Sequence, residues 1–260
     1  MKLSIVIPYF NRSNTIQRCL DSIGRHLDID TEIVVVDDCS YIEYIEHGYN
    51  EKIIRLPFNH GPVAARIVGA ENSTGDWILF LDSDDELFQD WNSIANFLKN
   101  SSDYSIHGFT SNREKPSRDY YISSQDEYWG WVGDINRAGD YILFVRRDLI
   151  VNLSFPKLRM SEVWFINKLF IMGRGIYHQT PIFIYHQDSG NQLSKKRVIT
   201  FLTTNFERIS IKFVAFEFIS LYHKLPNSFK KAWTKRLIKE AVLSLNFIAL
   251  CRIAFKVIEE

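Results

Sequence analysis

The chain has 260 residues, of which 46% are hydrophobic and 14% are aromatic. This composition excludes a disordered or collagen-like chain and suits one large α/β domain, alone or with a small appendage. The net charge is zero, but residues 195–260 carry 13 Lys/Arg against 5 Asp/Glu, so the preceding residues are acidic.

The charge distribution and the cysteines narrow the class of protein. An acidic region is consistent with a site balanced by a metal ion, and a basic end suits an anionic surface or partner. Cys19, Cys39 and Cys251 lack metal-ligand spacing, which favours a reducing cytosol and argues against structural zinc. The apolar run at residues 241–251 is about half of the ~20 residues that a membrane-spanning helix needs. We therefore expect a cytoplasmic protein.

The first hundred residues alternate between strand-like and helix-like segments. Continuous apolar runs predict buried strands, and apolar residues at helical spacing predict the helices between them. The predicted strands are residues 3–8, 32–36, 53–56 and 77–81, and the predicted helices are residues 14–27, 63–71 and 91–98. This order predicts an α/β fold with a mostly parallel, doubly wound sheet. Ligands of such sheets bind beyond the carboxyl ends of the strands, where Pro8, Asp38 and Asp82 fall.

The second half of the chain is less regular. Residues 111–140 are polar and aromatic with little helix or strand period, which indicates a long functional loop region. The later predicted elements are strands at residues 141–145 and 182–185, a helix at residues 162–172, and two helical segments beyond residue 195 that are hinged at residues 226–228.

Four carboxylates follow the apolar strand at residues 77–81 in the stretch WILFLDSDDELF. Asp82 and Asp84 are one residue apart, so at a strand end their side chains can aim at one point. Such oxygen ligands suit Mg²⁺ or Mn²⁺, which keeps open positions for phosphate oxygens of a substrate. An acidic surface turn is the alternative, but the buried strand places these carboxylates at the mouth of the sheet.

Asp37 and Asp38 repeat this arrangement one strand earlier. A turn or a helix cap explains the pair without a ligand, whereas a functional interpretation gives Asp38 hydrogen bonds from a base or ribose. Arg66, on the helix of small residues, is suited to pair with an acid or with a phosphate at the same place.

Four segments together resemble the successive motifs of the family 2 glycosyltransferases with the GT-A fold. They are SIVIPYFNR (4–12), EIVVVDDCS (32–40), NHGPVAARIVGA (59–70) and GDWILFLDSDDEL (75–87), and YILFVRRDL (141–149) resembles a fifth. The resemblance is close over about the first 95 residues. It implies a nucleotide-sugar donor, most often a UDP-sugar, a divalent cation (Mn²⁺ or Mg²⁺), and inversion at the transferred sugar.

The resemblance also implies a role for each matched position of the donor site. These roles are Pro8 and Tyr9 beside the nucleotide, Asp38 at the base, Arg66 near the base or diphosphate, Asp82 on the ribose side, and Asp84 as the residue that holds the metal. A cation bridging both phosphates would stabilise charge that develops on the leaving diphosphate.

The family's catalytic base lies in a Glu-Asp pair that begins a helix. SEVWFINKL (161–169) matches that motif at its Phe, basic and Leu positions, which places Glu162 where the family has Asp. Glu is a competent general base, but its extra methylene moves the carboxylate by about one bond. The alternative is that Glu162 only interacts with the helix dipole, with Ser161 as the cap.

Two further pairs of residues are candidates for the site. His186 and Asp188 lie in YHQDSG (185–190), where the family's closing segment completes the metal shell or contacts the diphosphate; a polar loop is the alternative. Trp129 and Trp131 lie in the variable loop where the family builds its acceptor site, and aromatic rings stack on sugars. Core packing is the alternative for both Trp residues.

The predicted domains are a catalytic domain at residues 1–194 and a basic helical region at residues 195–260. The catalytic domain would comprise a nucleotide-sugar half at residues 1–100 and an acceptor half at residues 101–194. Residues 228–245 resemble a basic amphipathic helix that suits the anionic inner face of the cell membrane. Packing on the catalytic domain, or on a second subunit in a homodimer, explains this helix equally well.

The implied reaction is a single displacement in bacterial polysaccharide, O-antigen or capsule synthesis, with a glycan or lipid-linked oligosaccharide as acceptor. A sugar-1-phosphate nucleotidyltransferase would need a Gly-rich basic loop that residues 9–12 lack. A module that binds nucleotide-sugar or glycan without turnover is favoured only by the Glu at position 162. Neither GxxxxGK[ST] nor GxGxxG occurs, and no nucleic-acid-binding motif matches.

Overall fold

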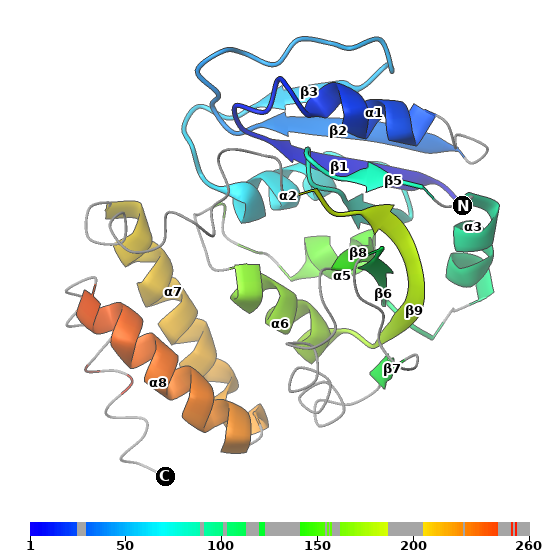
Figure 1. Ribbon diagram of the computed structural model, residues 1–260. Helices are drawn as coiled ribbons and strands as arrows, with labels where there is room; N and C mark the ends of the chain where they lie inside the picture. Colours follow the sequence, from blue (N-terminus) through cyan, green and yellow to red (C-terminus); the bar gives the residue numbers. More distant parts are fainter. Residues whose placement is uncertain are drawn as a thin grey trace.

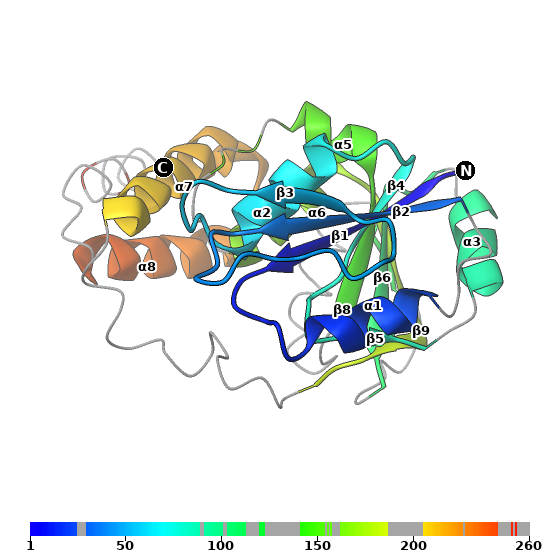
Figure 2. The same cartoon turned by 90° about the horizontal axis from the view of Figure 1, so that it is seen from above.

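The described part of the chain folds around one mixed sheet with helices on both faces (Figures 1 and 2). The computed structural model describes residues 1–24, 30–88, 91–100, 103–112, 120–122, 141–153, 155, 157, 162–186, 205–225, 227–243, 251 and 253. Within these residues the sheet has nine strands, eight of them in the order β3-β2-β1-β4-β8-β6-β9-β5, and β7 pairs with β9.

The first part of the sheet is parallel, as the sequence predicts. Its elements are β1 (Leu3–Tyr9), α1 (Ile16–Gly24), β2 (Thr31–Asp37), β3 (Lys52–Arg55), α2 (Pro62–Glu71) and β4 (Trp77–Phe80). Strands β3, β2, β1 and β4 run in the same direction, with Val6 opposite both Val34 and Phe80. Both faces of β1, β2 and β4 are covered by helices, which explains why these strands are apolar without alternation. Strand β3, at the edge of the sheet, is largely exposed.

The second part of the sheet is mixed. Its elements are β5 (Glu86–Leu87), α3 (Trp91–Asn100), β6 (Ile106–Ser111), β7 (Tyr120–Ile122), β8 (Tyr141–Arg146), α5 (Arg147–Asn152), α6 (Glu162–Met172) and β9 (Gly175–Ile184). Strand β8 is antiparallel to β4 and β6, whereas β6 is parallel to β9. The expected loop region at residues 111–140 contains the short strand β7. Strand β9 begins well before the predicted residue 182, because polar residues at its centre obscure the strand pattern.

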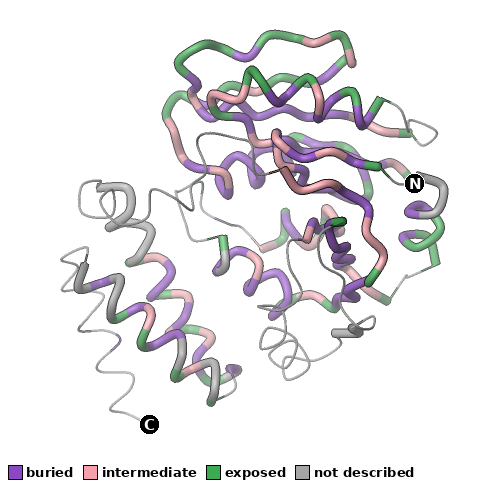
Figure 3. Tube along the Cα trace, viewed as in Figure 1, coloured by how far each residue is buried: buried purple, intermediate pink, exposed green. Residues whose placement is uncertain are grey.

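Two apolar cores lie on opposite faces of the sheet. Helices α2, α5 and α6 pack on one face, and α1 and α3 pack on the other. The buried positions of the central strands are continuous in Figure 3. Helix α2 lies close to β1 and β2 at Gly69, where a Cβ would overlap Val6 Cγ1 and would lie 3.2 Å from Val36 Cγ2.

A third apolar cluster contains the C-terminal helices α7 (Asn205–Leu221) and α8 (Asn227–Leu243), which are joined through the 3₁₀ turn Tyr222–Lys224. Their buried side chains pack against Trp164 and Ile171 of α6, and Figures 1 and 2 show the pair beside that helix. The two helical segments predicted beyond residue 195 are therefore present. The break between them includes the 3₁₀ turn, earlier than the predicted hinge at residues 226–228, because α8 already begins at Asn227. Among the helices that the structure describes, none combines the length and apolarity needed to cross a membrane.

Candidate active site

The carboxyl ends of β1, β2 and β4 lie next to one another because these strands are parallel neighbours. The segments that leave them remain in contact: Asp38 N–H donates to the carbonyl oxygen of Tyr9 at 2.8 Å, and Leu81 N–H donates to that of Val6 at 3.1 Å. Pro8, Asp38 and Asp82 therefore fall at one edge of the sheet, as the sequence predicts.

Arg66 joins two of the predicted site carboxylates. From α2, its Nη2 donates to Asp82 Oδ1 at 2.6 Å and its Nη1 donates to Glu162 Oε1. The Arg66 side chain is 10% exposed, whereas the side chains of Asp82 and Glu162 are 48% and 50% exposed. Burial acts to lower the pKa of Arg66, but Glu162 and Asp82 outweigh it and raise that pKa, so the guanidinium stays charged. A buried cation thus orients two half-exposed carboxylates.

Tyr141, the first residue of β8, lies beside this ion-pair group. Its pKa is raised by burial first, then by Tyr177 and by the negative charge of Glu162, so its phenol stays neutral. Sequence reasoning did not identify Tyr141 as a site residue, because an aromatic residue at the start of a strand is indistinguishable from a core residue.

Protein cations also contact the carboxylates that follow Asp82. Arg12 Nη2 lies 3.6 Å from Asp84 Oδ2, and Arg18 Nη2 donates to the Asp84 carbonyl oxygen at 2.9 Å. Glu86 Oε1 lies 3.4 Å from Arg18 Nε and 2.8 Å from His186 Nε2. His186 is therefore engaged with Glu86, and its role in a metal shell stays a prediction. Arg12 ends the segment at residues 4–12 that resembles the first family motif, and the resemblance implies no role for it.

The carboxylates that follow β4 are the candidates for holding a divalent cation. Within the described ranges, no three His, Cys, Asp or Glu side chains gather in a way that could hold a metal ion. A Mg²⁺-type site needs only one or two carboxylates when substrate phosphates and water supply the remaining oxygens. Asp84 lies 3.6 Å from Arg12, which is too long for a hydrogen bond, whereas Asp82 is bonded by Arg66 at 2.6 Å, and the metal-holding role of Asp84 stays a prediction.

Asp38 accepts two backbone hydrogen bonds from the residues that precede α2. Its Oδ1 accepts the N–H of His60 and its Oδ2 accepts the N–H of Gly61, both at 2.7 Å. Gly61 has φ 85°, a left-handed conformation that glycine adopts without strain. A carboxylate oxygen accepts more than one hydrogen bond, so the expected contact of Asp38 with a base stays a prediction.

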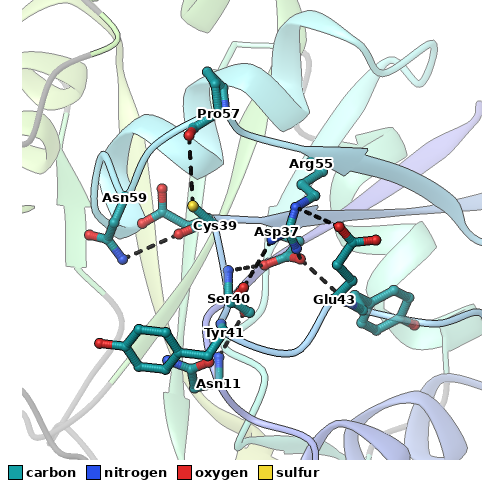
Figure 4. Close-up of polar contacts among 11 residues, drawn as sticks. Asn11, Asp37, Cys39, Ser40, Tyr41, Glu43, Arg55, Pro57 and Asn59 are labelled. Carbon is teal, nitrogen blue, oxygen red and sulfur yellow. Dashed lines mark hydrogen bonds and ion pairs between the residues drawn. The ribbon is translucent and has the colours of Figure 1, made fainter.

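The loops after β1 and β2 brace each other (Figure 4). Asn11 N–H donates to Ser40 Oγ, and Tyr41 N–H donates to Asn11 Oδ1, each at 2.9 Å. Behind them, buried Asp37 accepts the N–H of Ser40 at 2.9 Å and pairs with Arg55, which also donates to the Ser40 carbonyl oxygen. Asp37 therefore has the turn-forming role considered for it.

The aromatic residue exposed at the end of β1 is Phe10. Tyr9 is 3% exposed and its ring centroid lies 5.1 Å from that of Tyr44, so its face is occupied. Phe10 is 38% exposed and its ring lies 6.1 Å from that of the fully accessible Tyr41. The alternation of side chains along β1 predicts this difference in exposure, because Tyr9 lies on the same core-facing side of the strand as Ile5 and Ile7. Phe10 is therefore a second aromatic candidate for a nucleotide contact, and the contact expected of Tyr9 stays a prediction.

Four further positions that the sequence singles out lie outside the described residues: Trp129, Trp131, Ser161 and Asp188. Their predicted roles at the acceptor site, at the start of α6 and in the metal shell stay predictions.

Comparison with known proteins identifies the family. The model of glycosyl transferase family 2 matches residues 4–150, more than half of the chain. The chain belongs to glycosyl transferase family 2. Two uncharacterized glycosyltransferases of Haemophilus influenzae are similar to it: one is 32% identical over 63% of this chain and 69% of its own length, and the other is 37% identical over 32% and 29%.

Solved structures support the GT-A fold. The chain superposes on Staphylococcus aureus TarS 1–349 in complex with UDP-GlcNAc with a TM-score of 0.65 and 20% identity, over 84% of this chain and 67% of that one. It superposes on GalNAc-T7 with UDP, GalNAc and Mn²⁺ with a TM-score of 0.54 and 15% identity, over 85% and 48%. This chain spans less than a third of the length of several curated relatives that it matches.

Proposed function

We propose that the chain is a metal-dependent, inverting glycosyltransferase that moves a sugar from a nucleotide-sugar, a UDP-sugar, to a hydroxyl group of a glycan or lipid-linked acceptor. Family membership supports the reaction class, and the similar TarS structure contains UDP-GlcNAc. The observation that carries the proposal is that one guanidinium, Arg66, holds the donor-side Asp82 and the expected base Glu162. The residue proposed to act on the donor side and the residue proposed to act on the acceptor therefore share one cation.

The exposure and the ion pair of Glu162 support its proposed role as the general base. It is the first residue of α6, its carboxylate is half exposed, and Arg66 fixes its orientation from the buried side. In the proposed step the acceptor oxygen bonds to the anomeric carbon while its proton passes to Glu162. The bond from that carbon to the nucleoside diphosphate breaks on the opposite face, and the electron pair leaves with the diphosphate.

The leaving diphosphate needs positive charge near it. A Mn²⁺ or Mg²⁺ ion held by Asp84 would neutralise that developing charge, and GalNAc-T7, which shares the fold, was solved with Mn²⁺. Arg12 and Arg18 hold the Asp84 segment in place.

The test compares sugar transfer and UDP release, with and without Mn²⁺, for the wild-type chain and Glu162→Gln. Removing the base is expected to lower the rate of transfer by about 10²- to 10⁴-fold. Asp148→Asn is the matched control, because Asp148 is an exposed carboxylate in the first turn of the neighbouring helix α5.

Three outcomes separate the candidate functions. Transfer lost only in Glu162→Gln supports the base assignment over a helix-dipole role. Full transfer in Glu162→Gln would remove Glu162 as the base. Donor binding by the wild-type chain without transfer to any glycan or lipid-linked acceptor would favour a binding module.

We further propose that the protein works at the cytoplasmic face of the membrane. In α8 the apolar side chains Trp233, Leu237 and Ala241 are buried in the C-terminal cluster, whereas Lys231 and Lys235 are exposed. Attraction to an anionic surface would therefore be electrostatic, and association as a homodimer is the alternative. Flotation with anionic liposomes at low and high salt tests this: a protein that stays in solution at both salt concentrations would contradict it.

A further inference from the structure

Helix α6, which begins with Glu162, is packed between two apolar clusters. Phe165 and Leu169 belong to the core beneath the sheet, and Trp164 and Ile171 belong to the cluster of the C-terminal helices. A helix that is apolar all round must be covered on all sides. Here the core of the sheet covers one side of α6, and helices α7 and α8 cover the other (Figures 1 and 3).

One carboxylate of α7 bonds two polar groups of that helix. Trp164 Nε1 donates to Glu217 Oε2 at 2.8 Å, and Lys168 Nζ donates to Glu217 Oε1 at 2.5 Å. Trp164 is fully buried, and the Lys168 and Glu217 side chains are 10% and 14% exposed. A buried indole N–H and a buried ammonium group both require an acceptor, and Glu217 serves both.

Lys168 extends this connection to the other side of α6. Its ammonium group donates to the carbonyl oxygen of Leu153 at 3.3 Å and lies 4.5 Å from the centroid of the Phe155 ring. Leu153 caps the C-terminus of α5. Lys168 therefore ties α6 to α5 and to α7 at once.

Trp164 and Lys168 are four residues apart and lie on one face of the helix, one turn above the other. Two bonds at that spacing restrict both rotation of the helix about its axis and sliding along it. Glu162 precedes Trp164 by two residues, so its carboxylate moves with the same turn. A rotation or shift of α6 would therefore alter the ion pair between Glu162 and Arg66.

We propose that Glu217 is a positioning residue for sugar transfer, holding Trp164 and Lys168 so that α6 presents Glu162 at Arg66. On this basis α7 and α8 are part of the catalytic unit and not a separate appendage. The consequence for the rate rests on the proposed function of Glu162, whereas the effect on α6 does not.

The test is Glu217→Gln, which preserves size but offers one acceptor oxygen and an amide that cannot accept. A small displacement of the base is expected to lower kcat about 10- to 100-fold, with the KM for the donor within about twofold of wild type. Hydrogen exchange is expected to quicken in peptides that cover α6 and to stay unchanged in β1 and β4. Asp148→Asn, an exposed carboxylate that contacts Arg146, is expected to change none of these quantities.

A second variant tests whether the loss is specific. In Lys168→Met/Glu217→Gln the ammonium group is removed, so the single amide oxygen left at position 217 is free to accept the indole N–H of Trp164. We therefore expect kcat to recover by about threefold or more relative to Glu217→Gln. Unchanged kcat and unchanged exchange in Glu217→Gln would overturn the proposal. Faster exchange throughout the sheet, with kcat and KM both impaired, would also overturn it, since that shows general destabilisation.

The proposal remains testable without turnover. If the wild-type chain transfers no sugar, or if Glu162→Gln stays active, the proposed function fails, and the exchange data then decide the structural claim alone. Faster exchange confined to α6 supports the positioning contact, and unchanged exchange overturns it.

Discussion

Arg66 and Glu162, 96 residues apart in the chain, form an ion pair that joins α2 to the first turn of α6. The same guanidinium pairs with Asp82, at the end of β4. The sequence left open whether Arg66 meets an acid or a phosphate, and the structure shows two acids. The negative charges of the carboxylates that follow β4 are therefore partly balanced by Arg66, Arg12 and Arg18.

Arg66→Lys is expected to lower the rate of transfer by about 10- to 100-fold, because an ammonium group cannot reproduce the fork that holds both carboxylates. The charge is kept, so the loss would reflect geometry. Steady-state kinetics with a saturating donor measure it. Arg146→Lys, at a half-exposed arginine paired with Asp148, is the control and should stay within about twofold of wild type. Equal rates for Arg66→Lys and wild type would show that the fork is dispensable.

Local sequence patterns predicted the parallel half of the sheet. The runs that became β1, β2 and β4 are apolar because helices cover both faces, and α2 begins at Pro62, one residue before its predicted start. Strand β6 was missed because IHGFTS contains polar residues throughout, yet all six are buried. Its His107 bonds His178 of β9, and a pairing across 71 residues leaves no local signal.

The candidate site was predicted in part. Asp38, Asp82 and Asp84 follow strands and so lie at the expected edge, since parallel neighbours end together. The contact between Arg66 and Glu162 depends on how α2 packs near α6, and the spacing of residues within the sequence motifs contains no information about that packing. The role of Glu217 depends on the C-terminal helices, whose partner the sequence left undecided between membrane, subunit and catalytic domain.

Phe10→Ala is expected to weaken donor binding, because base–aromatic stacking contributes about 1–3 kcal/mol. That corresponds to a donor dissociation constant raised by about 5- to 150-fold. Calorimetry with a UDP-sugar and Mn²⁺ measures it. Phe97→Ala is the matched control, since Phe97 is also 38% exposed but lies on α3. A change of similar size in both variants would contradict a base contact at Phe10.

The buried pair His107 and His178 predicts a loss of stability in acid. Burial, and then the neighbouring His178, lower the pKa of His107 to about 3. The unfolded chain, with a His pKa near 6.5, binds a proton that the folded chain does not, so stability falls as the pH drops below about 6.5. His107 alone is expected to remove about 2 kcal/mol from the free energy of unfolding between pH 6.5 and pH 5.

Urea unfolding of the wild-type chain and His107→Phe at pH 8, 6.5 and 5 measures this effect. The variant removes the titrating ring but leaves His178, so its free energy of unfolding should vary less with pH between 6.5 and 5. Identical pH dependence in the two proteins would show that His107 does not limit stability in acid.

Gly69→Ala is expected to destabilise the fold by about 1–3 kcal/mol, although alanine is the better helix former by about 1 kcal/mol. The added Cβ would overlap Val6 Cγ1, and β1 cannot yield because it is bonded on both sides by β2 and β4. Val6→Ala makes room at that contact, so the double variant Val6→Ala/Gly69→Ala should lose less stability than the two single losses added together. Chemical denaturation of the four proteins measures the coupling. Strictly additive losses would mean that Gly69 is required for something other than its contact with Val6.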